Sequence, residues 1–327
     1  MAYLSFYRLE SHRAGGSDRS RHLLGARDLT VDDVDEHCQA ADEFQSGHSP
    51  RQKLFGRTVA LLFFQSSTRT RLGFESAAAA LGAHSIGMDD MSASRSNASI
   101  GESLEDCAAV VSRLCDTIVV RHHESDAAAR MAATSVVPVI NAGDGWNEHP
   151  TQALIDIYAM RRGLGTLRGK SIAFGGDPRG RVVRSLVKLL CFEAPREIVF
   201  CPPPQYAVPQ DVTWALAESQ IRQRSIGEID RALIECDAIM MAPYDMSAIG
   251  EAASSGYVSP HFTPQHFAIT AEKIKRTRSQ ALLFHPLPRF DEIDPSCDLL
   301  PNAMYFEQVR LSKFMRMAVL DRRLSSY

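Results

Sequence analysis

The chain has 327 residues, more than one compact core usually holds, so two domains are expected. Hydrophobic residues make up 45% and charged residues 23%, which is typical of globular proteins. The net charge of −3 gives the molecule as a whole no attraction to nucleic acid or to an anionic membrane, so any anion site must be a local cluster.

The cysteines and the apolar runs indicate a reducing compartment and no membrane span. Seven cysteines without a CxxC pair predict free, mostly buried thiols. No apolar run approaches the roughly 20 residues of a membrane-spanning helix. The residues before Leu24 contain several arginines, which only faintly suggest a transit peptide, and we interpret them as a disordered leader. These features predict a cytoplasmic protein.

Uninterrupted apolar runs alternate with helix-like segments along the chain. Such runs, without polar alternation, are typical of strands buried on both faces of a parallel sheet. The predicted strands are 58–64, 117–120, 137–140, 171–174, 197–201, 238–241 and 281–284. Predicted helices include 151–162, 182–192 and the amphipathic stretch YFEQVRLSKFMRMAVLDRRL. This rhythm predicts the α/β class with doubly wound parallel sheets, and a ligand site in the crevice between two domains.

A cluster of hydroxyls and arginines, SSTRTR at 66–71, stands where the first predicted strand ends and an alanine-rich helix begins. A helix N-terminus binds phosphate through its free N–H groups and partial positive charge. Ser67, Thr68 and Thr70 add hydroxyl donors, and Arg69 adds a planar fork that suits phosphate oxygens. A serine N-cap with solvated arginines would explain one hydroxyl but not the whole cluster. The cluster therefore predicts an anion site.

Neighbouring signals limit what this anion can be. The site lacks the glycines and the GK[ST] of a P-loop, which favours a small phosphate compound over a nucleoside triphosphate. Arg71 and Glu75 stand four apart on the helix and are expected to pair. The stretch FGGDPRGR at 174–181 also follows a strand, but it does not fit GxGxxG, which disfavours a dinucleotide. Its Arg179 and Arg181 fit anion binding and a solvated surface equally well.

Three motifs in this order resemble the aspartate/ornithine carbamoyltransferase family: SSTRTRLGFE at 66–75, NAGDGWNEHPTQALID at 141–156 and HPLPRFDEI at 285–293. With VVRHH at 119–123, the resemblance runs from about Leu24 to the C-terminal helix. HPLPR and NAGDG resemble the aspartate branch, because the ornithine branch carries a cysteine where this chain has Pro286.

The resemblance implies two doubly wound parallel-sheet domains and a C-terminal helix. The carbamoyl-phosphate domain would span 1–148 and the acceptor domain 149–300, with the helix of 301–327 packing back on the first domain. It further implies a homotrimer, or a dimer of trimers, with active sites shared between subunits. The expected partners are carbamoyl phosphate and an amine acceptor, with no nucleic acid, no membrane, no cofactor and no metal.

The resemblance also implies roles for the motif residues. The phosphate would be held by Ser67, Thr68, Arg69 and Thr70. The carbonyl oxygen of carbamoyl phosphate would be reached by Thr70, Arg121 and His149. The carbamoyl NH2 would be held by Gln152 and by the backbone carbonyls near Pro286 and Leu287, with a cis Leu287–Pro288 bond.

These residue types suit the chemistry, because negative charge develops on the carbonyl oxygen as an uncharged amine attacks. One preorganised donor to such an oxygen is worth about 3–4 kcal/mol. Taken singly, His149 could cap a helix, Gln152 could be solvated and Arg121 could pair with a carboxylate. The family's order and spacing disfavour these readings. His122 and His123 are interpreted as loop residues rather than metal ligands.

The chain departs from the aspartate branch in a loop that the family lends to a neighbouring subunit. That branch has a lysine directly before a Gly-Glu pair, whereas Ile100 precedes Gly101 here. Ser96 is expected to keep the serine role of the loop. Arg95 either reaches into the neighbouring site or is solvated.

A second departure concerns the acceptor. Pro243 and Asp245 stand where the aspartate branch has Arg-x-Gln, so an acidic residue would repel the side-chain carboxylate of aspartate. Residues expected at the acceptor are Arg181, matching the α-carboxylate arginine, with Tyr244, Asp245, Leu287 and Pro288. The favoured acceptor is a diamino acid or a guanidino compound. The alternative is a genuine aspartate carbamoyltransferase of pyrimidine biosynthesis in which 243–245 is a rebuilt surface loop.

A different class of function stays open. The lost lysine would also fit a catalytically inactive homologue that serves as a structural or regulatory subunit. The complete set of phosphate residues with Arg121, His149 and Gln152 argues against that reading. A nicotinamide-dependent dehydrogenase is disfavoured because GxGxxG is missing.

Overall fold

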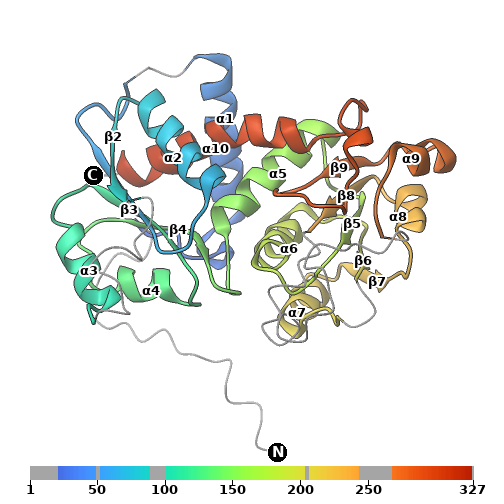
Figure 1. Ribbon diagram of the computed structural model, residues 1–327, viewed down its shortest axis with the longest axis horizontal. Helices are drawn as coiled ribbons and strands as arrows, with labels where there is room; N and C mark the ends of the chain where they lie inside the picture. The colour runs from blue at the N-terminus through green and yellow to red at the C-terminus, as the bar shows by residue number, and fades with distance from the viewer. Residues whose placement is uncertain (1–20, 49–51, 89–100, 203–205, 243–266, 326–327) are drawn as a thin grey trace, which may run out of the picture.

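The computed structural model describes residues 21–48, 52–88, 101–202, 206–242 and 267–325. Within this part of the chain, two sheets of parallel strands lie on either side of two long helices (Figure 1). The first sheet has the order β2-β1-β3-β4, with strands His84–Met88, Thr58–Phe63, Thr117–His122 and Val139–Asp144. The second has the order β7-β6-β5-β8-β9, with strands Arg222–Ser225, Glu197–Cys201, Ser171–Gly175, Ala238–Met241 and Leu282–Phe284. The predicted α/β class with two parallel sheets is confirmed.

The two strands that the apolar runs did not predict are both edge strands. All five residues of β2 are exposed, and β7, with the sequence RQRS, is exposed or half-buried throughout. An edge strand with one solvated side needs no continuous apolar run, so the criterion used for buried strands passes over it. The strand β3 also extends through His122, which corrects the interpretation of that histidine as a loop residue.

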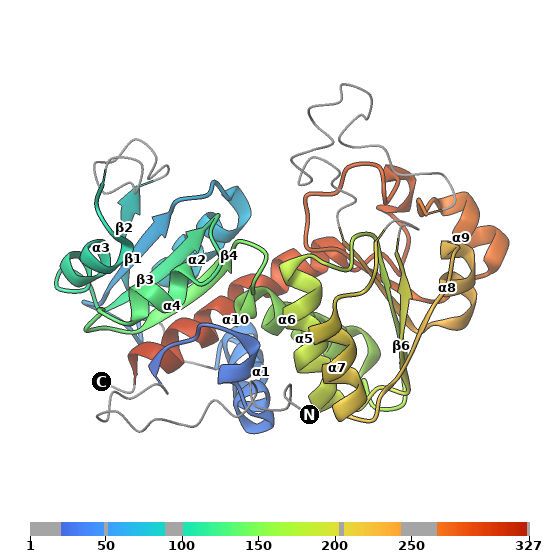
Figure 2. The same ribbon diagram turned by 90° about the horizontal axis from the view of Figure 1, so that it is seen from below.

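Helices cover both faces of each sheet, as Figure 2 shows from below. Apolar side chains of α3 (Leu104–Val111) and α4 (Ala127–Ala132) form one core with the outer face of the first sheet. The outer face of the second sheet packs in the same way against α8 (Ile229–Glu235) and α9 (Ala271–Thr277). The inner faces of the sheets face the centre of the molecule.

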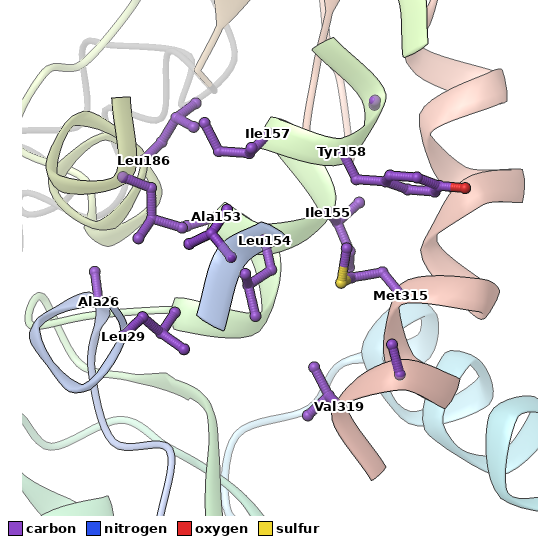
Figure 3. Packing of buried hydrophobic residues seen from close by; sticks show 14 of the residues in the cluster. Ala26, Leu29, Ala153, Leu154, Ile155, Ile157, Tyr158, Leu186, Met315 and Val319 are labelled. Carbon is purple, nitrogen blue, oxygen red and sulfur yellow. The ribbon is translucent and has the colours of Figure 1, made fainter. Parts of the chain in front are cut away.

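One continuous hydrophobic core joins the inner faces of both sheets. It includes Leu61 and Val119 from the first sheet and Ile172 and Phe200 from the second. Its helices are α1 (Val31–Ser46), α2 (Thr68–Ala80), α5 (Pro150–Leu164), α6 (Arg181–Glu193), α7 (Gln210–Glu218) and α10 (Tyr305–Leu324). Figure 3 shows side chains of α5 reaching toward Leu186 on one side and Met315 on the other. The central helices therefore pack against the inner faces of both sheets.

The ends of these helices follow from local sequence. Pro150 lies in the first turn of α5, where no N–H is needed, and Gly165 ends that helix at a φ of +76°. The helix α1 begins with a capping box between Thr30 and Asp33. The amphipathic stretch predicted at the C-terminal side forms α10 and packs against α1, α2 and α5.

All seven cysteines are free, and five of them are buried, as predicted. Within the described residues, no helix combines the length and the apolar character needed to cross a membrane.

Candidate active site

A cavity of about 730 Å3, called here the central cavity, lies where the C-terminal ends of strands from both sheets approach α10. In parallel α/β sheets this edge is the usual ligand site. The cavity is lined by these residues expected from the sequence: Ser67, Arg69, Thr70, Arg121, His149, Gln152, Arg181, Pro286, Leu287 and Pro288. Thr68 begins α2 beside them. Arg95, Ser96, Pro243, Tyr244 and Asp245 lie outside the described residues.

The N-terminus of α2 opens onto the central cavity without a side-chain cap. Ser67 occupies the N-cap position with extended backbone, yet its side chain makes no capping hydrogen bond, and no acidic residue lies in the first turn. The first N–H groups of the helix are thus not capped by Ser67 and can bind an anion. Arg71 pairs with Glu75 at 2.9 Å, as expected, which leaves Arg69 as the arginine of this segment that lines the cavity.

Arg121 leaves the end of β3 and is held in the cavity wall without a carboxylate partner among the described residues. Its Nη1 donates to the carbonyl oxygen of Ala142 at 3.3 Å, and its buried Nε has no hydrogen-bond partner in the described structure. Burial, followed by the charges of Arg181 and Arg69, lowers the pKa of Arg121 to about 9. The guanidinium is therefore a cation at neutral pH, and no described carboxylate pairs with it.

His149 lies beside this cation and is neutral. Burial, followed by the charges of Arg121, Arg181 and Arg316, holds the pKa of His149 well below its usual value of 6.5. It is the N-cap residue of α5, but its side chain makes no capping bond, and its Nδ1 contacts Thr151 Oγ1 at 3.2 Å. If the threonine hydroxyl donates to Nδ1, the ring proton lies on Nε2, where it can be donated to a ligand.

Arg181 connects the two halves of the site. Its Nη2 donates to Gln65 Oε1 at 3.1 Å and its Nη1 to the carbonyl oxygen of Gly145 at 3.0 Å. Gly143 has a φ of +110°, and a β-carbon there would lie 3.1 Å from both Arg181 Cζ and His149 Cδ2. Gly143, the first glycine of the NAGDG motif, is thus required by its backbone conformation and by the closeness of the Arg181 and His149 side chains.

A buried histidine, His285, holds the segment 285–288 in place through its hydrogen bonds. Its Leu287–Pro288 bond is cis, as implied by the resemblance, and Leu287 has a φ of +55°. His285 Nδ1 accepts a hydrogen bond from Leu287 N at 2.7 Å, so the ring proton lies on Nε2, which donates to Glu292 Oε1 at 2.7 Å. Both side chains are fully buried. This pair holds the loop whose residues 286–288 line the cavity.

Three of the plainer readings of the motif residues are excluded. His149 does not cap its helix through its side chain, and Arg121 has no carboxylate partner in the described structure. Gln152 is 9% exposed, and its Nε2 donates to Asp156 Oδ1 at 2.7 Å rather than to solvent. The open question about FGGDPRGR is answered residue by residue: Arg181 lines the cavity, whereas Arg179 pairs with Asp177 at 2.8 Å.

Residues of α10 line the cavity although no motif marked them. Arg316 is 3% exposed, donates to Ser312 Oγ at 2.6 Å, and lies over the ring of Phe74 with its Cζ 5.5 Å from the ring centroid. Burial lowers the pKa of Arg316 to about 10. Lys313 also borders the cavity. The signal that could have found Arg316 is Gly73, because a glycine inside a helix often marks a close approach.

The charges around the cavity are strongly unbalanced. Its described cations are Arg69, Arg121, Arg181, Lys313 and Arg316, and its single described carboxylate is Asp177. Asp177 is already paired with Arg179, whose guanidinium lies 3.7 Å from the ring centroid of Tyr206. Among the described residues, no group of His, Cys, Asp and Glu is arranged to hold a metal ion. The arrangement suits a ligand with more than one negative charge.

Comparisons with known proteins agree with this geometry. Residues 21–162 match the carbamoyl-phosphate-binding domain of aspartate/ornithine carbamoyltransferases, and residues 168–322 match their Asp/Orn-binding domain. The aspartate carbamoyltransferase catalytic subunit of Archaeoglobus fulgidus is 36% identical over 305 residues, covering 92% of this chain and 98% of its own. The corresponding subunit of Hyperthermus butylicus is 35% identical over 312 residues, covering 94% and 97%.

Solved structures give the same result. The catalytic subunit of M. jannaschii aspartate transcarbamoylase is 33% identical, with a TM-score of 0.82 over 94% of this chain and 98% of its own. Aspartate transcarbamoylase from Trypanosoma cruzi, in complex with N-(phosphonacetyl)-L-aspartic acid, has a TM-score of 0.82 at 29% identity, covering 91% and 94%.

Proposed function

The chain belongs to the aspartate/ornithine carbamoyltransferase family, and from this we propose that it moves the carbamoyl group of carbamoyl phosphate to the amine of an amino acid. Phosphate is the leaving group. The observation that carries the proposal is that one cavity unites the uncapped N-terminus of α2 with Arg69, Arg121, His149 and Gln152. A phosphate, a carbonyl oxygen and an amide each have a matching partner there.

In this proposal the phosphate lies at the start of α2. The backbone N–H groups of the first turn, the hydroxyls of Ser67, Thr68 and Thr70, and the guanidinium of Arg69 surround its oxygens. As the bond between the carbonyl carbon and the phosphate oxygen breaks, these donors stabilise the charge that collects on the departing phosphate.

The carbonyl oxygen lies between Arg121 and His149, with Thr70 as a third donor. Attack by the uncharged amine places negative charge on this oxygen, and both side chains are preorganised to receive it. Because His149 is neutral, it acts as a hydrogen-bond donor and not as an acid in the ordinary pH range. Gln152 and the carbonyl groups near Pro286 and Leu287 hold the NH2 group, so that the carbonyl carbon faces the acceptor.

We propose L-aspartate as the acceptor, which was the alternative in the sequence interpretation. The relatives at 33–36% identity are aspartate carbamoyltransferases by name, and the described cavity is rich in cations with its one carboxylate neutralised. Arg181 would bind the α-carboxylate by replacing its two neutral acceptors, Gln65 and Gly145, with a charged one.

A second acceptor is favoured by one observation. The sequence has Pro243 and Asp245 in place of Arg-x-Gln, and this supports a diamino acid or a guanidino compound whose cationic end meets Asp245. The support for this acceptor is the identity of these residues, which lie outside the described part of the chain.

The test is a screen of acceptors with carbamoyl phosphate, in which acceptor-dependent phosphate release and the carbamoylated product are both measured. Saturation by L-aspartate at sub-millimolar concentration supports the first acceptor. A preference for a diamino acid that Asp245→Asn reverses supports the second. Binding of carbamoyl phosphate without turnover on any amine would refute both acceptors. Failure to bind it at all would favour an inactive structural or regulatory homologue.

We also propose that the active protein is a homotrimer, or a dimer of trimers, in which a loop with Ser96 and Arg95 completes the site of a neighbour. The family resemblance supports this assembly. Mixing an Arg69→Ala variant with an Arg95→Ala variant tests the shared site. If Arg95 acts in its neighbour's site, the hybrids regain activity, whereas a solvated Arg95 would leave the Arg95→Ala variant fully active by itself.

A further inference from the structure

A buried carboxylate beneath the cavity floor connects three separate segments. Asp156 lies one turn after Gln152 on α5 and is fully buried. Its Oδ1 accepts a hydrogen bond from Gln152 Nε2 at 2.7 Å and another from Gln308 Nε2 of α10 at 2.5 Å. Gln308 in turn reaches the loop at 285–288, because its Oε1 accepts from the backbone N–H of His285 at 3.0 Å.

The backbone N–H of His285 and the carboxylate of Asp156 together fix the direction of every hydrogen bond in this network. A backbone N–H can only donate, so the N–H of His285 requires the oxygen of the Gln308 amide. The NH2 of Gln308 is then directed to Asp156, whose Oδ1 must accept. When Asp156 is ionised, Oδ1 can only accept, so Gln152 directs its NH2 toward it and the amide oxygen of Gln152 is left for the cavity. The network thus decides an orientation that the amide alone would leave two-fold.

We propose that Asp156 is a positioning residue that fixes the amide of Gln152 with its oxygen toward the carbamoyl NH2 of the substrate. The inference rests on the proposed carbamoyl transfer, in which Gln152 contacts that group. With the amide reversed, two NH2 groups would face each other and the substrate would lose its acceptor. Through Gln308, the same carboxylate sets the position of the segment whose carbonyl groups hold the other side of the NH2.

The burial of Asp156 carries a desolvation cost that its hydrogen bonds only partly offset. Its Oδ2 has no hydrogen-bond partner in the described structure, although the atom is buried. Burial raises the pKa of Asp156 to about 7, against hydrogen bonds from Gln152 and Gln308 and the charge of Arg316, which lower it. A buried charged group is weak evidence for a stabilising role, because its desolvation cost offsets the contribution of its partners. A role in orienting a substrate-binding amide accounts for the carboxylate.

A double-mutant cycle between Asp156→Asn and Gln152→Ala tests the proposal. The substituted asparagine can turn its NH2 toward Gln152, so Asp156→Asn should lower kcat by about 10- to 100-fold. Binding of inorganic phosphate, which uses the start of α2, should not change. In the Gln152→Ala background, Asp156→Asn should cause a much smaller loss of kcat, because the amide of Gln152 is gone and only the contact through Gln308 remains. If the two losses multiply, the proposal is wrong.

Controls separate positioning from folding and from the proposed function. Asp321→Asn removes another buried carboxylate, which lies on α10 and pairs with Lys53 at 2.6 Å, and it should leave kcat unchanged. If Asp156→Asn does not fold, Gln308→Met removes the second donor instead, and it should lower kcat less in the Gln152→Ala background than in the wild type. An equal loss in both backgrounds would overturn the proposal. Turnover of carbamoyl phosphate by the wild type tests the proposed function separately. If the wild type shows no turnover, the proposed function and the role of Asp156 are both overturned.

Discussion

The guanidinium of Arg316 fills the space that a side chain at position 73 would need. A β-carbon on Gly73 would lie 2.5 Å from Nη1 and 2.7 Å from Cζ of Arg316. Gly73 lies inside α2, where glycine costs about 1 kcal/mol relative to alanine. The glycine therefore lets a cation from α10 lie directly against the helix whose N-terminus opens onto the central cavity.

Gly73→Ala should displace Arg316 and weaken the binding of carbamoyl phosphate while the fold persists. The gain in helix propensity, about 0.5–1 kcal/mol, would be offset by the steric conflict with the buried guanidinium. Urea unfolding and the KM for carbamoyl phosphate measure the two effects. In an Arg316→Ala background, the same substitution should become stabilising. If Gly73→Ala stabilises the wild type equally, the contact has no energetic importance.

Arg69→Ala should abolish turnover with every acceptor, because it removes the described cation at the start of α2 that lines the cavity. The matched control is Arg71→Ala, two positions away on the same helix, whose side chain pairs with Glu75. That pair is partly exposed, so its loss should cost about 0.5 kcal/mol of stability, and loss of the hydrogen bond from Arg71 to the carbonyl oxygen of Met88 about 1 kcal/mol more, while the affinity for phosphate stays intact. Calorimetric titration with inorganic phosphate compares the two variants, and equal losses would contradict the assignment.

His149 should act without being protonated. His149→Ala should lower kcat by about 10²- to 10³-fold, the usual cost of losing one donor to a developing oxyanion, whereas His149→Gln keeps a donor and should lose less. The pKa of His149 is lowered in the folded state, so below about pH 6.5 the unfolded chain binds a proton that the folded chain does not. Stability should therefore fall as the pH drops below this value, and His149→Gln should reduce that slope. An unchanged slope in urea unfolding between pH 5 and 7 would argue against a buried neutral ring.

Glu292→Ala should raise the KM for carbamoyl phosphate by loosening the loop at 285–288. It removes the acceptor of the buried His285 Nε2–H and the carboxylate oxygen that accepts from the backbone N–H of Phe290 at 2.9 Å. The unsatisfied donor on His285 costs about 1–3 kcal/mol. Glu292→Gln retains one acceptor oxygen and should lie between the wild type and Glu292→Ala. Thermal unfolding and steady-state kinetics check the order, and equal effects of the two substitutions would be inconsistent with it.

The buried interior was predictable from the sequence, whereas the edges were not. The predicted strands 197–201 and 238–241 coincide with β6 and β8, because a strand buried on both faces must be apolar throughout. The edge strand β2 carries no such requirement and was missed. The cluster at the start of α2 was found because hydroxyls and an arginine at a strand-to-helix junction have few structural uses.

The contribution of α10 was hidden for a physical reason. Gln308 and Arg316 are polar residues on an amphipathic helix, where polar side chains are normally solvated. Only the fold turns them inward, against Asp156 and Gly73. The exchange of Arg-x-Gln for Pro243 and Asp245 was visible in the sequence, but residue identity alone does not say which charge reaches the acceptor.

The contact between Gln308 and Asp156 joins residues 152 positions apart. A chain that ends before α10 cannot make this contact, and it also lacks the apolar side chains that α10 contributes to the central core. The core and the contact that orients the amide are therefore both complete only once residues 305–324 have been synthesised.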